Sequence, residues 1–116
     1  MSAAAGWRSP SVHPRPLSGL RVLDLTRVLA GPYCTLLLAD LGAEVAKVER
    51  PGTGDDARAF GPFLENGQSA YFASINRGKK SIALDLKEES DRETFLQLID
   101  HSDVLVENYR AGTMQK

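Results

Sequence analysis

The hydrophobic and polar positions of residues 21–50 follow the pattern of a strand, a helix and a second strand. Residues 22–25 form a short, mostly apolar run, after which Ala30-Gly31-Pro32 interrupts the extended pattern and begins a helix. Glycine adopts backbone angles that other residues avoid, and proline suits the first helical position, where an amide donor is not needed. We therefore expect Gly31 to supply an unusual conformation and Pro32 to begin the helix.

Four leucines between positions 36 and 41 are too crowded for one helical stripe, which predicts a helix covered on more than one side. Gly42 stands where helices commonly end on a left-handed residue, and residues 45–48 have the composition of a strand. A crossover this short joins two parallel strands with a right-handed connection. Residues 21–50 are thus predicted to form one βαβ unit.

A long loop and a second unit of strand, helix and strand follow. Residues 51–56 combine proline, glycine and acids as a turn, and residues 57–80 have no clean period, with a short helix expected near 69–74. Residues 81–86 and 103–107 have the patterns of a third and a fourth strand.

The helix between the third and fourth strands carries a start signal and an apolar face. Ser90 and Glu93 have the S-x-x-E spacing of a capping box, in which two side chains satisfy free amides at a helix start. We expect its buried face to comprise Phe95, Leu96, Leu98 and Ile99.

The resulting order, β-α-β-loop-β-α-β, predicts an α/β fold with a Rossmann-like parallel sheet and flanking helices. The pattern ends just after a strand, so we expect residues 19–116 to be one truncated domain of a larger protein. Residues 1–18 contain two arginines, three prolines and no acid, which predicts a disordered leader. A transit peptide shares this composition, but the prolines oppose a long amphipathic helix, so we expect a cytoplasmic protein with the mitochondrial matrix as the alternative.

Composition narrows the classes of function. The chain has 14 basic and 15 acidic residues and a net charge of −1, which argues against bulk binding to nucleic acid or to an anionic membrane. No apolar run approaches the ~18 residues of a membrane span. Cys34 lies in the apolar helix and is expected to be a buried structural thiol, and two distant histidines complete no metal site with it.

Candidate chemistry gathers at the carboxyl ends of the strands, where open α/β sheets bind ligands. Arg27, Arg50 and Lys87 follow three different strands and could form a phosphate site, although ordinary solvated charges are the alternative. Glu49 could bind a ribose hydroxyl, but residues 27–32 lack the G-x-G-x-x-G of dinucleotide sites.

The acids near these strand ends have other expected roles. We expect Asp24 and Asp85 to cap neighbouring backbone groups, and the adjacent acids Asp55 and Asp56 to lie in a solvated turn.

Several motifs in a fixed order resemble the N-terminal part of the class III coenzyme A transferases, which include formyl-CoA, carnitine-CoA and succinyl-CoA:dicarboxylate transferases. The resemblance extends from Leu17 to Lys116, nearly everything beyond the leader. The matching segments are Leu20-Arg21-Val22-Leu23-Asp24-Leu25-Thr26, Ala30-Gly31-Pro32, Asp40-Leu41-Gly42-Ala43-Glu44-Val45, Lys47-Val48-Glu49-Arg50-Pro51-Gly52-Thr53-Gly54-Asp55, Asn76-Arg77-Gly78-Lys79-Lys80-Ser81-Ile82 and Asp103-Val104-Leu105-Val106-Glu107-Asn108-Tyr109.

The resemblance implies an enzyme that moves coenzyme A from an acyl-CoA to a small carboxylic acid through an aspartyl-CoA thioester. It implies no prosthetic group, and an interlocked homodimer for the full-length protein. The family's nucleophilic aspartate lies further along than this sequence reaches, so we assign no catalytic residue here. By position, the residues implied to contact CoA are Val28, Ala30, Arg50, Leu84, Lys87, Asn108 and Tyr109.

Departures from the family's patterns bear on the substrate. Arg27 and Leu29 stand where formyl-CoA transferases carry histidine and glutamine, which disfavours oxalate, and residues 49–58 are most similar to succinyl-CoA-dependent dicarboxylate transferases. The related acyl-CoA racemases are one alternative, although they have a shorter segment in place of residues 55–75 and no asparagine like Asn108. A non-catalytic fragment that binds a nucleotide or a partner chain is the other.

Overall fold

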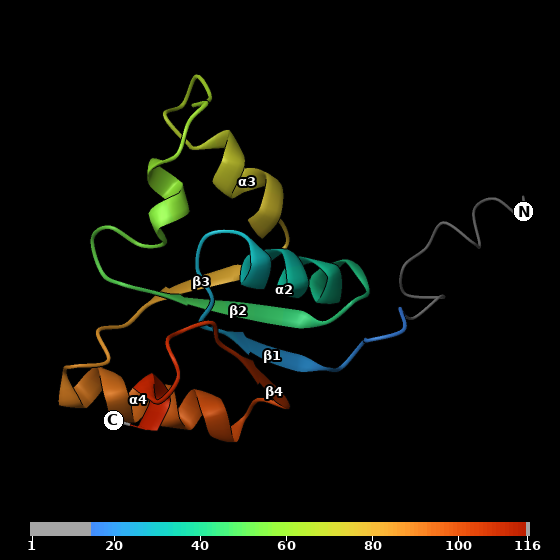
Figure 1. Cartoon of the computed structure of the whole chain (residues 1–116). Coiled ribbons are helices and arrows are strands. Elements are labelled where there is room, and N and C mark those ends of the chain that lie inside the picture. Colours follow the sequence, from blue (N-terminus) through green and yellow to red (C-terminus); the bar gives the residue numbers. More distant parts are fainter. Residues whose placement is uncertain (1–14, 116) are drawn as a thin grey trace, which may run out of the picture.

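The computed structural model describes residues 15–115, which form a four-stranded parallel sheet with helices on both faces (Figure 1). The strand order is β3-β2-β1-β4, which confirms the predicted α/β class. The first 14 positions of the predicted leader lie outside the described residues. The elements are β1 (Arg21–Asp24), α2 (Ala30–Asp40), β2 (Glu44–Glu49), the 3-10 helix η1 (Asp56–Ala59), α3 (Ala70–Asn76), β3 (Lys80–Ala83), α4 (Glu89–Asp100), β4 (Val104–Val106) and the 3-10 helix η2 (Thr113–Gln115).

The central strand β1 is paired on both sides. Val22 stands opposite Val45 of β2 and Val104 of β4, and its side chain is buried. Residues of the same strand alternate between the two faces of a sheet. Both faces of β1 are covered, since its residues 22–24 are all buried, whereas the edge strands β3 and β4 are largely exposed.

Two apolar cores lie on opposite faces of the sheet. Leu23, Val48 and Phe95 belong to the core under α4, whereas Val22 and Val45 belong to the core under α2. Figure 1 shows α2 and α4 on opposite sides of the strands. The carboxyl ends of the strands point toward a common edge, and the connections that follow them border the candidate site.

The start of α2 differs from the prediction. The helix begins at Ala30, so Pro32 is its third residue rather than its first. The left-handed conformation belongs to Val28, whose φ is 74°, and not to Gly31. Gly31 is required for space instead, since a Cβ atom there would lie 2.3 Å from Cβ of Thr26. The predicted left-handed residue after the helix is confirmed at Gly42, whose φ is 108°.

The predicted burial of α2 is also wrong on its outer side. Among the described residues, nothing covers Tyr33, Leu37 and Leu41, each about half exposed, and Cys34 is exposed rather than buried. The helix contacts the sheet mainly through its inner face, where Thr35 and Leu36 are buried. One apolar stripe was therefore enough to dock this helix.

The second half of the chain follows the predicted order with shorter strands and a different helix start. Helix α4 begins at Glu89, so Ser90 lies inside the helix and does not form the predicted capping box. Near the helix start, the carboxylate of Asp91 accepts the Asp85 amide at 2.9 Å. Phe95 is buried as expected, whereas Leu96 is half exposed. The expected short helix is confirmed as α3, where Ser69 Oγ accepts the Phe72 amide at 3.1 Å.

Candidate functional site

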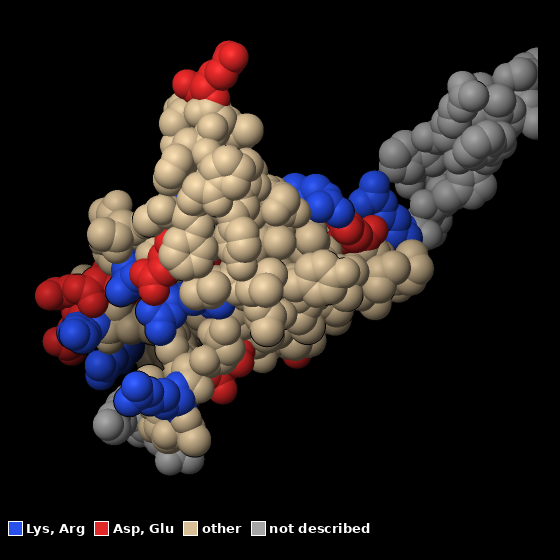
Figure 2. Space-filling model, turned by 45° about the horizontal axis from the view of Figure 1, so that its top comes forward, with Lys and Arg blue, Asp and Glu red and all other residues tan. Residues whose placement is uncertain are grey.

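A cavity of about 420 Å³ opens at the carboxyl ends of the strands. Leu84, Leu86 and the ring of Tyr109 line it on the side that continues into the core under α4. The three basic residues that the sequence placed at strand ends, Arg27, Arg50 and Lys87, line this same cavity. Figure 2 shows one group of Lys and Arg side chains at the left end of the molecule, with acidic side chains beside them, and a second group toward the right. The cavity thus combines an apolar wall with a basic rim.

Two of the three basic side chains share an acidic partner. The guanidinium of Arg50 binds the carboxylate of Asp56, and Arg27 Nη1 lies 3.9 Å from Asp56 Oδ2. Arg27 also lies over the ring of Tyr109, 5.6 Å from its centroid. The side chains of Arg27, Arg50 and Asp56 are 40–52% exposed, so these ion pairs add little to the stability of the fold. The guanidinium groups that meet the Asp56 carboxylate here could also bind a phosphate.

The turn between β1 and α2 forms the side of the site next to Arg27. Asn108, in the segment after β4, pairs with both peptide groups of Arg27: its Oδ1 accepts the amide at 3.2 Å, and its Nδ2 donates to the carbonyl at 3.0 Å. Asn108 therefore shapes the turn from outside the cavity. Of the seven residues implied to contact CoA, four line the cavity and three lie in this turn or against it. The lining four are Arg50, Leu84, Lys87 and Tyr109, and the others are Val28, Ala30 and Asn108.

A buried ion pair contacts the same turn and lines the same cavity. Lys47 Nζ is 2.8 Å from Asp55 Oδ2 and donates to the Thr26 carbonyl at 2.9 Å, and the two charged side chains are 2% and 0% exposed. Asp55 Oδ1 accepts the amides of Val28 at 3.1 Å and Ala57 at 2.9 Å. Burial by itself raises the pKa of Asp55, but the hydrogen bonds from Lys47 and the two amides outweigh it and lower that pKa.

Asp55 and Asp56 thus behave differently, which corrects the prediction that both lie in a solvated turn. Only Asp56 is exposed, whereas Asp55 is among the buried charged residues. The adjacent glycine is part of the reason, because Gly54 has a φ of 68° and lets the chain reverse against β2. Lys47 and Asp55 are site residues that the sequence interpretation missed. The available signal was Lys47 itself, a charge on the inward face of a strand buried on both sides.

Glu49, at the end of β2, is fully engaged within the protein. Arg58 donates to both of its oxygens, at 2.7 and 2.8 Å, and the hydroxyl of Ser81 and the amide of Asp55 also donate to it. Burial raises the pKa of Glu49, but the hydrogen bonds from Arg58, Ser81 and the Asp55 amide outweigh it and lower the pKa from 4.5 to about 2. Its oxygens are thus already paired, which removes the one feature that favoured a dinucleotide ribose.

A second buried ion pair anchors α2. Lys79 Nζ lies 3.2 Å from Asp24 Oδ2 and also donates to the carbonyl of Pro32 at 3.0 Å and to Oδ1 of Asn76 at 2.8 Å. Burial lowers the pKa of Lys79, which the Asp24 charge partly opposes. The predicted capping roles of two acids are confirmed, since Asp24 accepts the Thr26 amide and Asp85 accepts the Lys87 amide. Within residues 15–115, no group of three histidine, cysteine or acidic side chains could hold a metal ion, and no helix is long and apolar enough to cross a membrane.

Comparisons with known proteins agree on one family. The model of CoA-transferase family III matches residues 17–116. The chain is 60% identical to the succinyl-CoA:mesaconate CoA-transferase of Haloarcula hispanica, over 86% of this chain and 26% of that protein. It is 50% identical to the acetyl-CoA:oxalate CoA-transferase of Acetobacter aceti, over 93% and 28%. It is 54% identical to the succinyl-CoA:glutarate CoA-transferase of Mus musculus, over 88% and 23%.

A solved structure supports the same relationship. A CAIB/BAIF family protein from Brucella suis superimposes with a TM-score of 0.80 at 45% identity, covering 87% of this chain and 28% of that one. The chain therefore spans about a quarter of the length of the relatives it matches.

Proposed function

The chain belongs to CoA-transferase family III, and we propose that it is the CoA-binding portion of an enzyme that transfers coenzyme A from an acyl-CoA to a carboxylic acid. The observation that carries this proposal is the cavity at the strand ends, where basic side chains and an apolar wall occur together. Coenzyme A joins a phosphorylated adenosine to a long pantetheine arm. A site for it needs both kinds of surface.

The residues of the cavity suit these two parts of coenzyme A. Arg27, Arg50 and Lys87 offer positive charge to the phosphate groups, and arginine does so with a permanently charged fork. Leu84 and Tyr109 offer apolar surface to the adenine or the pantetheine arm. The proposed contact set also includes the backbone of Val28, in the turn beside Arg27, and of Ala30, the first residue of α2. Asn108, which pairs with the peptide groups of Arg27, completes it.

The transfer chemistry belongs to parts of the protein outside this chain. We propose that an aspartate beyond residue 116 forms the CoA thioester, and that residues 19–116 hold the CoA nucleotide while the acyl group and the acceptor exchange at that aspartate. The aspartate carboxylate attacks the acyl-CoA thioester, which forms a mixed anhydride and releases the CoA thiolate. The thiolate must stay bound so that it can attack the aspartyl carbonyl of this anhydride, which forms the aspartyl-CoA thioester and releases the donor acid as its carboxylate. Tight binding of the nucleotide keeps the thiolate in place. We further propose the interlocked homodimer of the family for the full-length protein.

The proposed donor is succinyl-CoA and the proposed acceptor is a small dicarboxylic acid. The similarity of residues 49–58 to succinyl-CoA-dependent enzymes supports this, as do the names of the Haloarcula and mouse relatives. The relative from Acetobacter aceti is named for acetyl-CoA and oxalate, so both belong in the substrate panel.

An exchange assay on the protein in its full natural length tests the proposal. Succinyl-CoA or acetyl-CoA is incubated with labelled succinate, glutarate, mesaconate or oxalate, and the labelled thioester is measured. We expect transfer from succinyl-CoA to at least one of these acids. The proposal fails if no labelled thioester forms with either donor, and proton exchange at the α-carbon of a branched acyl-CoA, without transfer, would favour a racemase.

A further inference from the structure

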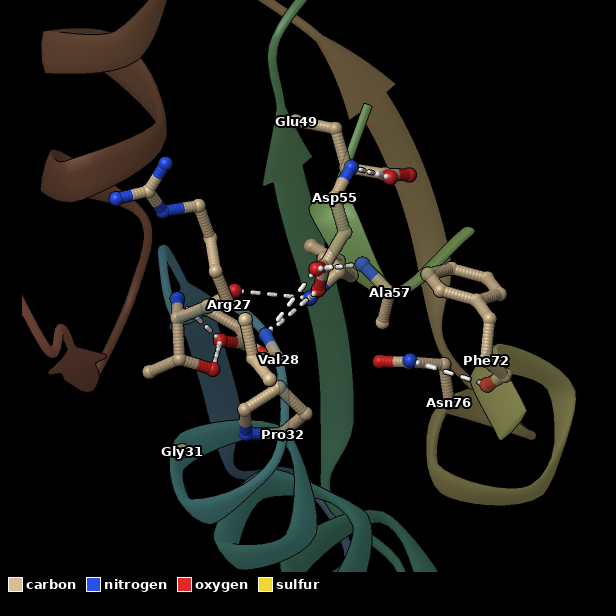
Figure 3. A network of polar contacts seen from close by, with 12 residues as sticks. Arg27, Val28, Gly31, Pro32, Glu49, Asp55, Ala57, Phe72 and Asn76 are labelled. Atoms are coloured by element: carbon tan, nitrogen blue, oxygen red, sulfur yellow. Dashed lines mark hydrogen bonds and ion pairs between the residues drawn. The ribbon is translucent and has the colours of Figure 1, made fainter. Parts of the chain in front are cut away.

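The peptide groups of the turn between β1 and α2 are held by charged side chains from β2 and the loop after it. Lys47 donates to the Thr26 carbonyl. Asp55 accepts the Val28 amide (Figure 3). Lys47 and Asp55 also bind each other at 2.8 Å. One buried ion pair thus binds the turn at the Thr26 carbonyl and at the Val28 amide, on either side of Arg27.

The turn needs these hydrogen bonds because of the conformation of Val28. Its φ of 74° is in the left-handed region, which a β-branched side chain rarely occupies. Strained residues of this kind persist only where their surroundings determine them strongly, and they gather at binding and catalytic sites. Asp55 is the residue that holds Val28 in this conformation, since both of its carboxylate oxygens lie within 3.4 Å of the Val28 amide nitrogen.

Stability alone does not account for the ion pair. Burying two charges is costly, and apolar side chains of similar volume often stabilise a core as well or better. Lys47 and Asp55 are 2% and 0% exposed, so water does not solvate them. What an apolar pair could not do is hold one carbonyl and one amide of the turn at fixed positions.

We propose that Lys47 and Asp55 are positioning residues of the CoA site, which hold Thr26 to Ala30 in the shape that receives the ligand. The inference rests on the proposed function, because it assigns these residues to that same site. Both residues also line the cavity at the strand ends, but their side chains are 2% and 0% exposed, so we expect them to act through the turn rather than by direct contact with coenzyme A. Both act through the backbone of Val28 and through the position of the neighbouring Arg27.

A matched control lies in the second buried ion pair. Lys79 is also 2% exposed and pairs with a fully buried aspartate, but its hydrogen bonds go to Asp24, Pro32 and Asn76. Lys47→Met and Lys79→Met therefore each remove a buried positive charge and leave an equally buried aspartate without its ion-pair partner. Only the first change removes a side chain that contacts the turn directly. In Lys79→Met, Asp24 keeps the oxygen that accepts the Thr26 amide.

The test is calorimetric titration of coenzyme A into the full-length wild type, Lys47→Met, Lys79→Met, Asp55→Ala and Asp55→Asn, with a melting temperature for each. We expect Lys47→Met and Asp55→Ala to weaken binding on the order of tenfold or more, and Lys79→Met to lower the melting temperature with affinity within about twofold of wild type. Asp55→Asn keeps an oxygen for the Val28 amide and is expected to be intermediate, and it serves as the measurement if Asp55→Ala does not fold.

A second readout follows Val28 itself. The φ-dependent coupling constant of its amide, measured by NMR, should change in Asp55→Ala and stay as in wild type in Lys79→Met. Unchanged CoA affinity in the Asp55 and Lys47 variants, or an equal loss in Lys79→Met, would overturn the positioning role. If the wild type itself does not bind coenzyme A, the proposed function has failed, which is a different result.

Discussion

The side-chain amide of Asn108 pairs with both peptide groups of Arg27, as donor to the carbonyl at 3.0 Å and as acceptor from the amide at 3.2 Å. The pair joins the segment after β4 to the turn after β1, across 81 residues of sequence. A carboxamide presents a donor and an acceptor together, which no other side chain except glutamine does with this geometry.

Replacing Asn108 with aspartate should weaken CoA binding a few-fold, because the variant loses the donor to the Arg27 carbonyl and the turn becomes less fixed. Calorimetry with coenzyme A measures the effect. Asn66→Asp is the control, since Asn66 lies in an exposed turn away from the cavity. Its Oδ1 accepts the Gln68 amide, which aspartate can still do, and its Nδ2 donates only a long hydrogen bond of 3.5 Å to Gln68 Oε1. Equal affinities in the two variants would contradict the role given to Asn108.

Arg50 and Arg58 should respond to alanine in different ways. Arg50→Ala removes a half-exposed cation from the cavity rim and should weaken CoA binding about tenfold with little change in stability. Arg58→Ala leaves the buried Glu49 without its main partner and should lower the free energy of unfolding by about 1–3 kcal/mol. Titration and urea unfolding separate the two effects, and a larger loss of affinity in Arg58→Ala would count against the assignment.

Asp56 should compete with the ligand. It binds Arg50 and approaches Arg27, the two arginines proposed to meet phosphate. Asp56→Asn should therefore strengthen CoA binding about two- to fivefold, more at low than at high ionic strength. Asp40→Asn, which removes an exposed acid paired with Arg77, is the control and should change nothing. Weaker binding in Asp56→Asn would show that this acid helps the site.

Acid should destabilise the fold through Glu49. Its pKa is about 2 in the folded chain against an ordinary 4.5, so the unfolded state binds more protons between these values. The stability contributed by its ionised form is present above about pH 4.5 and is lost progressively as the pH falls toward 2. Urea unfolding from pH 6 to 3 should show a shallower pH dependence in Glu49→Gln than in wild type. Identical slopes would mean that other carboxylates cause the acid sensitivity.

Local patterns predicted most of the fold because strands and helices depend on residues close in sequence. The strand predicted from residues 22–25 and the left-handed Gly42 followed from the local pattern alone. The exposure of Cys34 and Leu37 could not be predicted in this way, because it depends on which surfaces meet α2 and not on the helix itself.

The candidate site divides in the same manner. The strand ends carrying Arg27, Arg50 and Lys87 were predictable, because parallel strands end at a common edge. The contacts that shape the turn were not, since Lys47 meets Thr26 and Asn108 meets Arg27 only after the sheet has formed. The burial of Asp55 beside the exposed Asp56 likewise depends on the fold of a loop that has no periodic pattern.

The most direct test of the central claim is calorimetric titration of the full-length wild type with coenzyme A, with dephospho-CoA and with pantetheine. If the cavity at the strand ends is a CoA site with a basic rim, coenzyme A should bind most tightly, dephospho-CoA more weakly, and pantetheine, which has no phosphate, weakest. Equal affinities for the three ligands, or no binding of coenzyme A, would contradict the account.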